Sequence, residues 1–346
     1  LIARRHAGDD EGPWLFEVVN HLNKAAGLAQ RPEERYALAR RNLDAGRRAM
    51  RAAAFGPAAE YLEAGIAALP AGAWSDRYEL ALGLHADAAE CAYVNARFDR
   101  VAALIAAVKD HARTLLDRIK ALEIEMESRM ARDDLKGAVG VALQALDELG
   151  FHLPERPGDA EVGAAVRRAM GALAGVGVDA IERLPDVDDP VVAAAQRILT
   201  RASSPAYYAA PALLPIIACE LVVTSVQRGL STATPFAFAV YGIVLNSAGL
   251  MPQAHACGEL AERLIERWDD RRLEARTRLV VNNHVCTWIA LISAGVHTRP
   301  HNSVELPYTF EAKGSIEAIS CGLPTGTPES ANCVLNVQSG SASPAF

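Results

Sequence analysis

The residues of this chain that could bind a metal ion are few and poorly placed. His297 and His301 stand four positions apart, and Cys286 lies upstream of them. Two ligands four apart on one helix face are typical of a zinc site. Pro300 interrupts such a helix, and no further ligand cluster appears nearby. We therefore expect no metal site here.

Two other arrangements could carry proton or phosphate chemistry. His111 falls late in a predicted helix, where a phosphoacceptor histidine is conceivable, but no glycine-rich ATP-binding boxes follow it. We expect it to be an ordinary histidine on a helix surface. Glu123, Glu125 and Glu127 alternate with apolar residues, and paired carboxylates can do acid–base work. Residues two apart on a helix point in different directions, so we expect a solvated face.

The motifs of nucleotide-using enzymes and hydrolases are absent from the sequence. There is no G-x-x-x-x-G-K-[ST] loop, and the pair Gly175 and Gly177 lacks the third glycine and the preceding strand of a dinucleotide site. The H-R-D, D-F-G, A-P-E, H-E-x-x-H and G-x-S-x-G motifs are missing too. Trp74 and Trp288 are predicted to be packing anchors. The sequence thus predicts no catalytic, cofactor-binding or metal-binding residue, and no enzyme activity for this chain.

Charge and cysteine usage narrow the class of protein further. The net charge is -7 and no long basic stripe occurs, so nucleic-acid binding has little electrostatic support. The arginine pairs at 47–48, 167–168 and 271–272 are expected on solvated helix faces. The six cysteines form no C-x-x-C pair, which favours reduced and mostly buried thiols in a cytoplasmic protein. They are Cys91, Cys219, Cys257, Cys286, Cys321 and Cys333.

Neither a signal peptide nor a membrane span is predicted. The most apolar stretch, 206–227, contains Pro211, Pro215 and Glu220 and falls short of a clean apolar run of about 20 residues. We expect a buried pair of helices there. The chain begins with Leu1 and not with methionine, so we expect it to be a fragment of a longer protein.

The elements that would position any site are predicted to be helices. Hydrophobic residues make up 51% of the chain while aromatic residues make up 6%, because alanine, the best helix former, supplies much of the apolar content. No segment alternates with period two, so no sheet is expected. First-turn prolines are expected at Pro13, Pro32, Pro57, Pro190 and Pro252.

A recurring pattern links these predicted helices. Four times, a short turn carries one large apolar residue and, three or four positions on, a small residue that opens a helical run. The turn segments 54–59, 96–102, 134–138 and 249–254 precede a run from 60 to 69 and runs that extend to 108, 149 and 265. The large apolar residues of the first three turns are Phe55, Phe98 and Leu135. We interpret Phe55 and Phe98 as buried plugs between two helices. The first three anchors lie 43 and 37 residues apart, wider than the tetratricopeptide period of roughly 34. The prediction is an all-α fold, either a tetratricopeptide-like repeat solenoid or a stacked helix bundle; an irregular bundle with accidental similarity is the alternative.

The pattern stops after residue 290. Residues 154–159 and 184–190 are predicted loops, and 291–346 is rich in Ser, Thr, Pro, Gly and Asn and is expected to be an irregular tail. Two hypotheses explain the tail equally well. It is either a flexible linker or sequence foreign to the fold, for example through a reading-frame change.

Ordered landmarks over residues 1–290 resemble a known family. They are GDDEGPWLFEVVNHLN at 8–23, LARRNLDAGRRA at 38–49, YLEAG at 61–65, AECAY at 89–93, LDELGFHLP at 146–154, PAYY at 205–208 and YGIVL at 241–245. This order resembles the helical middle region of large bacterial signalling proteins. Those proteins combine a serine/threonine kinase, an AAA- or STAND-type ATPase and a sensor histidine kinase.

The resemblance implies an organisation and a role. Residues 1–30 would be the end of the ATPase module and its junction, 31–153 tetratricopeptide-like repeats, 154–290 further helical repeats and 291–346 the tail. The chain would be a non-catalytic interaction or regulatory segment whose partners are protein domains or peptides, including the neighbouring modules. ATP and Mg²⁺ would belong to the parent protein and not to this chain. The alternatives are part of an active kinase with catalytic domains elsewhere, or a stand-alone helical protein-binding protein.

Overall fold

The computed structural model describes residues 14–268 and 270–286, and all regular secondary structure within them is helical. One isolated parallel bridge, between Asp186 and Leu230, is the sole β pairing there. The all-α prediction is therefore confirmed. The chain forms two compact units, unit 1 up to Asp134 and unit 2 from Leu135. Pro13 and the tail 291–346 lie outside the described residues.

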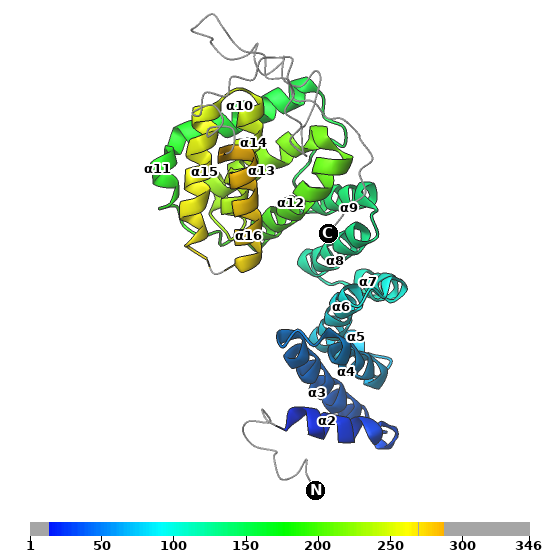
Figure 1. The fold of residues 1–346 in the computed structure, drawn as a ribbon. Coiled ribbons are helices and arrows are strands. Elements are labelled where there is room, and N and C mark those ends of the chain that lie inside the picture. The colour runs from blue at the N-terminus through cyan, green and yellow to red at the C-terminus, as the bar shows by residue number, and fades with distance from the viewer. Residues whose placement is uncertain (1–13, 269, 287–346) are drawn as a thin grey trace, which may run out of the picture. The chain divides into compact units, whose positions relative to one another are not determined.

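Unit 1 is a run of helices in which consecutive helices pack together (Figure 1). Pro32 is the first residue of its second long helix, as predicted, because its fixed φ suits the first turn. Thr114 and Asp117 form a capping box at the last helix, each side chain accepting from the other's backbone N–H. The elements are α2 (Leu15–Lys24), η1 (Ala26–Leu28), α3 (Pro32–Arg51), α4 (Phe55–Ala68), α5 (Ala73–Asp76), α6 (Tyr78–Val94), α7 (Phe98–His111) and α8 (Leu115–Ala131).

Unit 2 is built around two helices that are apolar on nearly every side. Its elements are α9 (Leu135–Glu148), α10 (Asp159–Val176), α11 (Val178–Ile181), α12 (Pro190–Ala209), η2 (Pro211–Leu213), α13 (Leu214–Arg228), α14 (Thr234–Ser247), α15 (Met251–Ile265), α16 (Arg271–Val280) and the π-helical η3 (Val281–Cys286). Helix α13 packs against α10, α12 and α14, and α14 packs against α13, α15 and α16. Both are buried around most of their circumference, which is the environment that an all-round apolar helix requires.

One segment of unit 2 also meets the length and composition of a membrane-spanning helix. It is Pro211–Arg228, with a mean hydropathy of 1.3, and 67% of it is buried inside the structure. The predicted helix pair in 206–227 is present here as the end of α12 and the whole of α13. The apolar character of the segment is accounted for by its place in the core of unit 2.

The predicted turns between helices share one backbone geometry. The four new helices begin at Phe55, Phe98, Leu135 and Met251. In each turn the residue two positions before the new helix has a positive φ. It donates its N–H to the carbonyl three residues back, and the next N–H reaches the carbonyl five residues back. This is the Schellman motif, which satisfies the last carbonyls of a helix. The positive-φ residues are Ala53 (55°), Ala96 (55°), Asp133 (62°) and Gly249 (75°).

These four turns, which we call hinges, differ from the sequence prediction in two respects. The helices begin at the large apolar residue itself, at Phe55, Phe98 and Leu135, and not a few residues after it. Phe55 and Phe98 are half-buried, not fully buried plugs. Each is the first residue of its helix, so part of its ring remains exposed at the helix end. Phe55 packs against the hydrophobic core of unit 1. The guanidinium carbon of Arg132 lies 5.9 Å from the ring centre of Phe98. Removing either ring should therefore cost less than the about 3–5 kcal/mol of a fully buried phenylalanine.

A second feature also recurs in unit 1: a tyrosine hydroxyl donates to an aspartate about 40 positions later in the chain. We call the two pairs, Tyr36–Asp76 and Tyr78–Asp117, the tyrosine seam. The hydroxyl of Tyr36 donates to Asp76 at 3.2 Å, and that of Tyr78 donates to Asp117 at 2.7 Å. The hinges are also joined, because the amide of Asn95 in the second hinge donates to the carbonyl of Phe55 in the first at 3.0 Å. The same contact type thus recurs in register along unit 1.

Glycines let the helices of unit 1 approach closely. A Cβ on Gly65 would lie 2.5 Å from Cδ2 of Leu84, and one on Gly46 would lie 2.6 Å from Cγ of Leu62. Real Cβ atoms do not tolerate such contacts, and both leucines are fully buried. The leucine of one helix therefore occupies the space that the glycine of the adjacent helix leaves open.

The hinge geometry predicts a stabilising substitution. Ala53 is exposed and has a positive φ, a conformation that costs an L-residue with a Cβ roughly 1–2 kcal/mol. Replacing Ala53 with glycine removes that strain but adds freedom to the unfolded chain, so Ala53→Gly should stabilise by about 0.5–1 kcal/mol. Urea unfolding followed by circular dichroism measures the change. Ala52→Gly, one residue earlier at φ -88°, is the control and should not stabilise; equal effects at both positions would contradict the assignment.

Candidate functional site

Two histidines of unit 1, His85 and His111, lie beside one tryptophan. The ring of Trp74 stacks on that of His111, with centres 4.6 Å apart and planes at 10°, and it also contacts His85 at 4.8 Å and Tyr78 at 6.0 Å. Trp74 is thus the packing anchor that the sequence predicted. Nδ1 of His111 donates to the carbonyl of Ala107 at 2.8 Å. His111 is exposed on α7, as expected for a surface histidine.

His85 differs from His111 in burial. It is 9% exposed on α6, and its Nδ1 donates to the carbonyl of Ala81 at 2.8 Å. Burial lowers the pKa of His85, because the charged imidazolium loses its hydration, while the hydrogen bond to Ala81 opposes this shift. The ring is therefore held in its neutral form. A buried neutral histidine among aromatic rings is a packing group, not a proton shuttle.

The tyrosine seam changes the pKa of one of its carboxylates, that of Asp117. Burial acts to raise the pKa of Asp117, but hydrogen bonds from Tyr78 and Thr114 outweigh it and the pKa is lowered. The guanidinium of Arg113 lies 4.3 Å from the centre of the Tyr78 ring, and its backbone N–H donates to the same hydroxyl. These polar contacts therefore join α6 to the start of α8. Sequence reasoning missed the seam, because its partners are distant in the chain.

The glutamates of α8 are not the solvated face that the sequence predicted. Glu123, Glu125 and Glu127 are each partly buried. Glu125 accepts from Lys109 of α7 at 2.5 Å and from Arg129 at 3.0 Å. Burial opposes ionisation, but these two cations lower the pKa of Glu125 below its ordinary value. The ion pair of Glu125 with Lys109 joins α8 to α7, which accounts for this carboxylate without an acid–base role.

Arg47, Arg167, Arg168 and Arg271 are exposed, as predicted for the arginine pairs, and two of these four pair with carboxylates. Arg47 donates from Nε to Asp87 at 2.6 Å, and Asp87 is 6% exposed. Lys120 lies 3.7 Å from the other oxygen of Asp87. In unit 2, Arg168 forms an ion pair with Glu220, which is the charge that breaks the apolar run of α13. A buried carboxylate needs such a partner, so these pairs are structural.

Three of the cysteines are buried thiols. Cys91, Cys219 and Cys257 are buried and free, and burial raises the pKa of each thiol to about 12. This confirms the predicted buried thiols for these three. No group of three or more His, Cys, Asp or Glu side chains that could hold a metal occurs among residues 14–268 and 270–286. Trp288, His297, His301, Cys321 and Cys333 lie outside the described residues.

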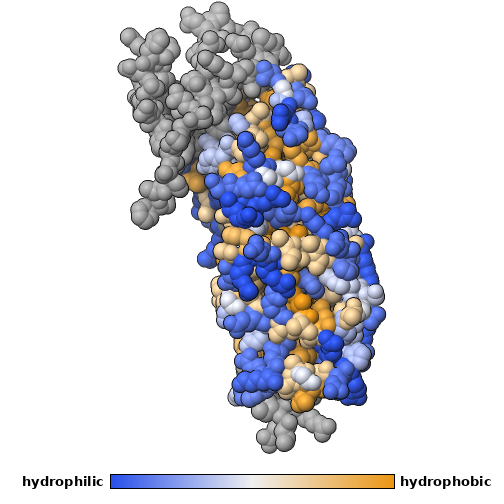
Figure 2. Space-filling model, turned by 90° about the vertical axis from the view of Figure 1, so that its right-hand side faces the viewer, coloured by the Kyte–Doolittle hydropathy of each residue, from blue (hydrophilic) through white to orange (hydrophobic). Residues whose placement is uncertain are grey.

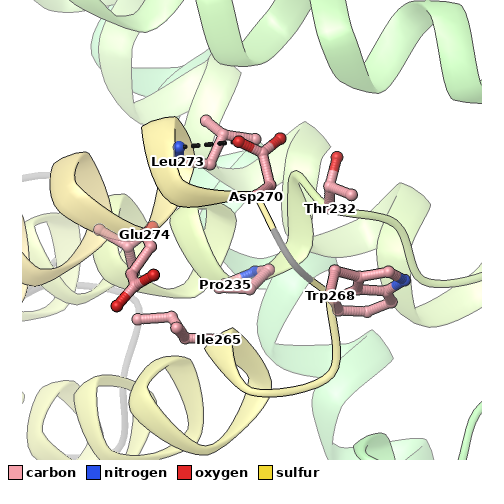
Figure 3. Close-up of a pocket in the computed structure, with 8 residues that line it drawn as sticks. Thr232, Pro235, Ile265, Trp268, Asp270, Leu273 and Glu274 are labelled. Carbon is pink, nitrogen blue, oxygen red and sulfur yellow. Dashed lines mark hydrogen bonds between the residues drawn. The ribbon is translucent and has the colours of Figure 1, made fainter.

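Unit 2 contains the cavities of interest. The cavity in Figure 3 measures about 10 Å³, roughly the space of one water molecule, and Asp270 at its edge accepts from the N–H of Leu273 at 3.2 Å. A broad depression of about 440 Å³ lies between α9, the 154–159 loop and η2, with Lys136, Glu155 and Arg156 around it. A third cavity, of about 170 Å³, has an arginine in its wall. Gly175 lies in the last turn of α10, and Gly177 caps that helix with a φ of 81°.

Comparison with known proteins gives no family assignment. No protein family, curated protein or solved structure matches this chain.

The environment of His85 predicts a pH dependence of stability. Its pKa is lowered in the folded chain, so the unfolded chain binds more protons as the pH falls below about 6.5. The stability that neutral His85 provides is complete above that pH and is lost as the pH falls toward the folded-state pKa. Urea unfolding at pH 7.5 and 5.5 should show a smaller difference for His85→Leu than for the parent. Identical differences for His85→Leu and the parent would contradict the assignment.

Proposed function

We propose that this chain is a non-catalytic helical-repeat segment that binds protein modules in a multidomain bacterial signalling kinase. The observation that supports the proposal best is the recurrence of one hinge and one tyrosine–aspartate contact along unit 1. Repetition of this kind is how solenoid proteins extend a core by contacts between neighbouring units. Such stacks present extended surfaces suited to peptides and domains.

The type of repeat is part of the proposal. Hinges at Ala53 and Ala96 with their paired helices α3/α4 and α6/α7 favour a tetratricopeptide-like solenoid with a period wider than usual. The resemblance of residues 1–290 to the helical middle of kinase–ATPase signalling proteins adds the context. In that context ATP and Mg²⁺ act in neighbouring modules, the parent protein is the enzyme, and the segment works in the cytoplasm.

The first elements of unit 1 offer a surface for the preceding module. Leu28 on η1 is 81% exposed and Trp14 at the start of α2 is 52% exposed. Figure 2 shows one face of the molecule on which apolar residues, in orange, reach the surface between hydrophilic ones. Exposed large apolar side chains at a module boundary favour a contact with the adjoining module. The occupant that we propose for this surface is an ATPase module, which the resemblance implies directly upstream.

The docking proposal is tested with the two parts expressed separately. The upstream module from the same reading frame is titrated against this chain, and Leu28→Ser should weaken the complex about tenfold if Leu28 is an anchor residue. Val94→Ser is the matched control, since Val94 is also exposed in unit 1, at 47%, but ends α6. It should change the affinity less than about twofold. A frame without an upstream ATPase module, or equal effects of both variants, would overturn the proposal.

The non-catalytic role predicts an inert chain in phosphotransfer assays. With labelled ATP and Mg²⁺, the purified chain should neither hydrolyse ATP above the buffer rate nor become labelled. The reason is the missing phosphate loop and kinase motifs in its sequence. Stoichiometric labelling of any histidine, including His111, would show that the chain is a phosphotransfer protein after all.

A further inference from the structure

The cavity of about 170 Å³ in unit 2 combines an apolar wall with one cationic group. It lies between α12, α14 and α16. Phe236 and Val240 of α14 form its floor and are 4% and 3% exposed. Tyr208 and Leu279 stand at its mouth and are 65% and 60% exposed, large values for such side chains. An apolar pocket with a few polar groups is the usual form of a small-molecule site.

Arg276 supplies the charge in this wall. Its guanidinium carbon lies 4.8 Å from the ring centre of Phe236. No ion pair joins Arg276 to a carboxylate among the residues that the structure describes, whereas Arg278 on the same helix pairs with Glu262 and Glu274. Burial, and then the positive charge of Arg201, lowers the pKa of Arg276. Arg276 is therefore a partly desolvated cation that a bound anion would stabilise.

The other residues that line the cavity limit the class of ligand that it could bind. Tyr207 and Tyr208 of α12 form an edge-to-face pair, with ring centres 4.9 Å apart. Ser204 adds a hydroxyl beside them. Aromatic faces next to a guanidinium suit a flat ring bearing one carboxylate, which the planar fork of arginine binds through two parallel hydrogen bonds. The volume lies below the roughly 300–1,000 Å³ of drug-sized sites, so the ligand would have a single ring.

We propose that this pocket binds a small aromatic carboxylate, with its ring against Phe236 and Val240 and its carboxylate on Arg276. A doubly charged phosphate is disfavoured because most of the wall is apolar and offers few donors. The site would give the chain a small-molecule input in addition to protein docking. It does not depend on the docking proposal, since it lies wholly in unit 2.

The test uses the full chain with phenylacetate and benzoate as probes. Ligand-observed NMR titration should show saturable binding of at least one of them. Phenylacetamide, which has the same ring as phenylacetate but no charge, and inorganic phosphate should bind at least about tenfold more weakly, since each lacks one half of the recognition. Equal binding of phenylacetamide, tighter binding of phosphate, or no carboxylate binding up to about 10 mM would overturn the proposal.

Variants assign the binding to this pocket. Arg276→Gln should lower the affinity at least about tenfold, the scale of a lost charge-assisted hydrogen bond. Arg278→Gln, two residues along the same helix, should change it less than about twofold. Circular dichroism establishes that each variant is folded. Should Arg276→Gln fail to fold, Tyr208→Ala decides, because its exposed side chain can be removed without disturbing the core and its loss should weaken binding several-fold. Unchanged affinity in the decisive variant would refute the site.

Discussion

The hinge is the constraint on which unit 1 depends. A helix that ends in a Schellman turn satisfies its last carbonyls within the chain, and the next helix begins two residues after the positive-φ residue. In unit 1 this brings α3 against α4 and α6 against α7, and in unit 2 α14 against α15. The turn is the same whether alanine, aspartate or glycine takes the positive φ. Backbone hydrogen bonding thus outweighs the strain of placing a Cβ there.

What keeps the paired helices together is close approach combined with matched polar groups. Leucines of one helix enter the space over glycines of another, as Leu84 does over Gly65. Polar groups caught at these contacts find partners: Asn42, fully buried, exchanges amide hydrogen bonds of 2.8 Å with Asn23. Tight packing and full satisfaction depend on one another, because an amide without a partner at such a contact would cost about 1–3 kcal/mol.

The local features of this fold could be predicted from the sequence, but the contacts between residues far apart in the chain could not. The turns before α4, α7 and α15 could be predicted, since a turn followed by a helical period is a local signal. The helices themselves begin within the predicted turn segments, at Phe55, Phe98 and Met251. The seam could not, because nothing near Tyr36 indicates that its partner is Asp76. Burial was misjudged for the same reason. Glu125 reads as a surface residue on its own helix, and only the packing of α7 places Lys109 beside it.

The same limit explains why the candidate site was missed. In the sequence, each arginine of the charged helix 271–280 looks like a solvated cation. The sequence does not show which of these arginines lies beside a carboxylate. The fold separates them: Arg278 meets two glutamates, and Arg276 meets the face of Phe236. Elsewhere in the described chain, charge burial is offset within the protein, as at Asp87 and Glu125. At Arg276 the compensation comes from an aromatic ring, which attracts a cation more weakly than a carboxylate does. A bound anion would therefore stabilise the Arg276 cation more strongly than the ring of Phe236 does.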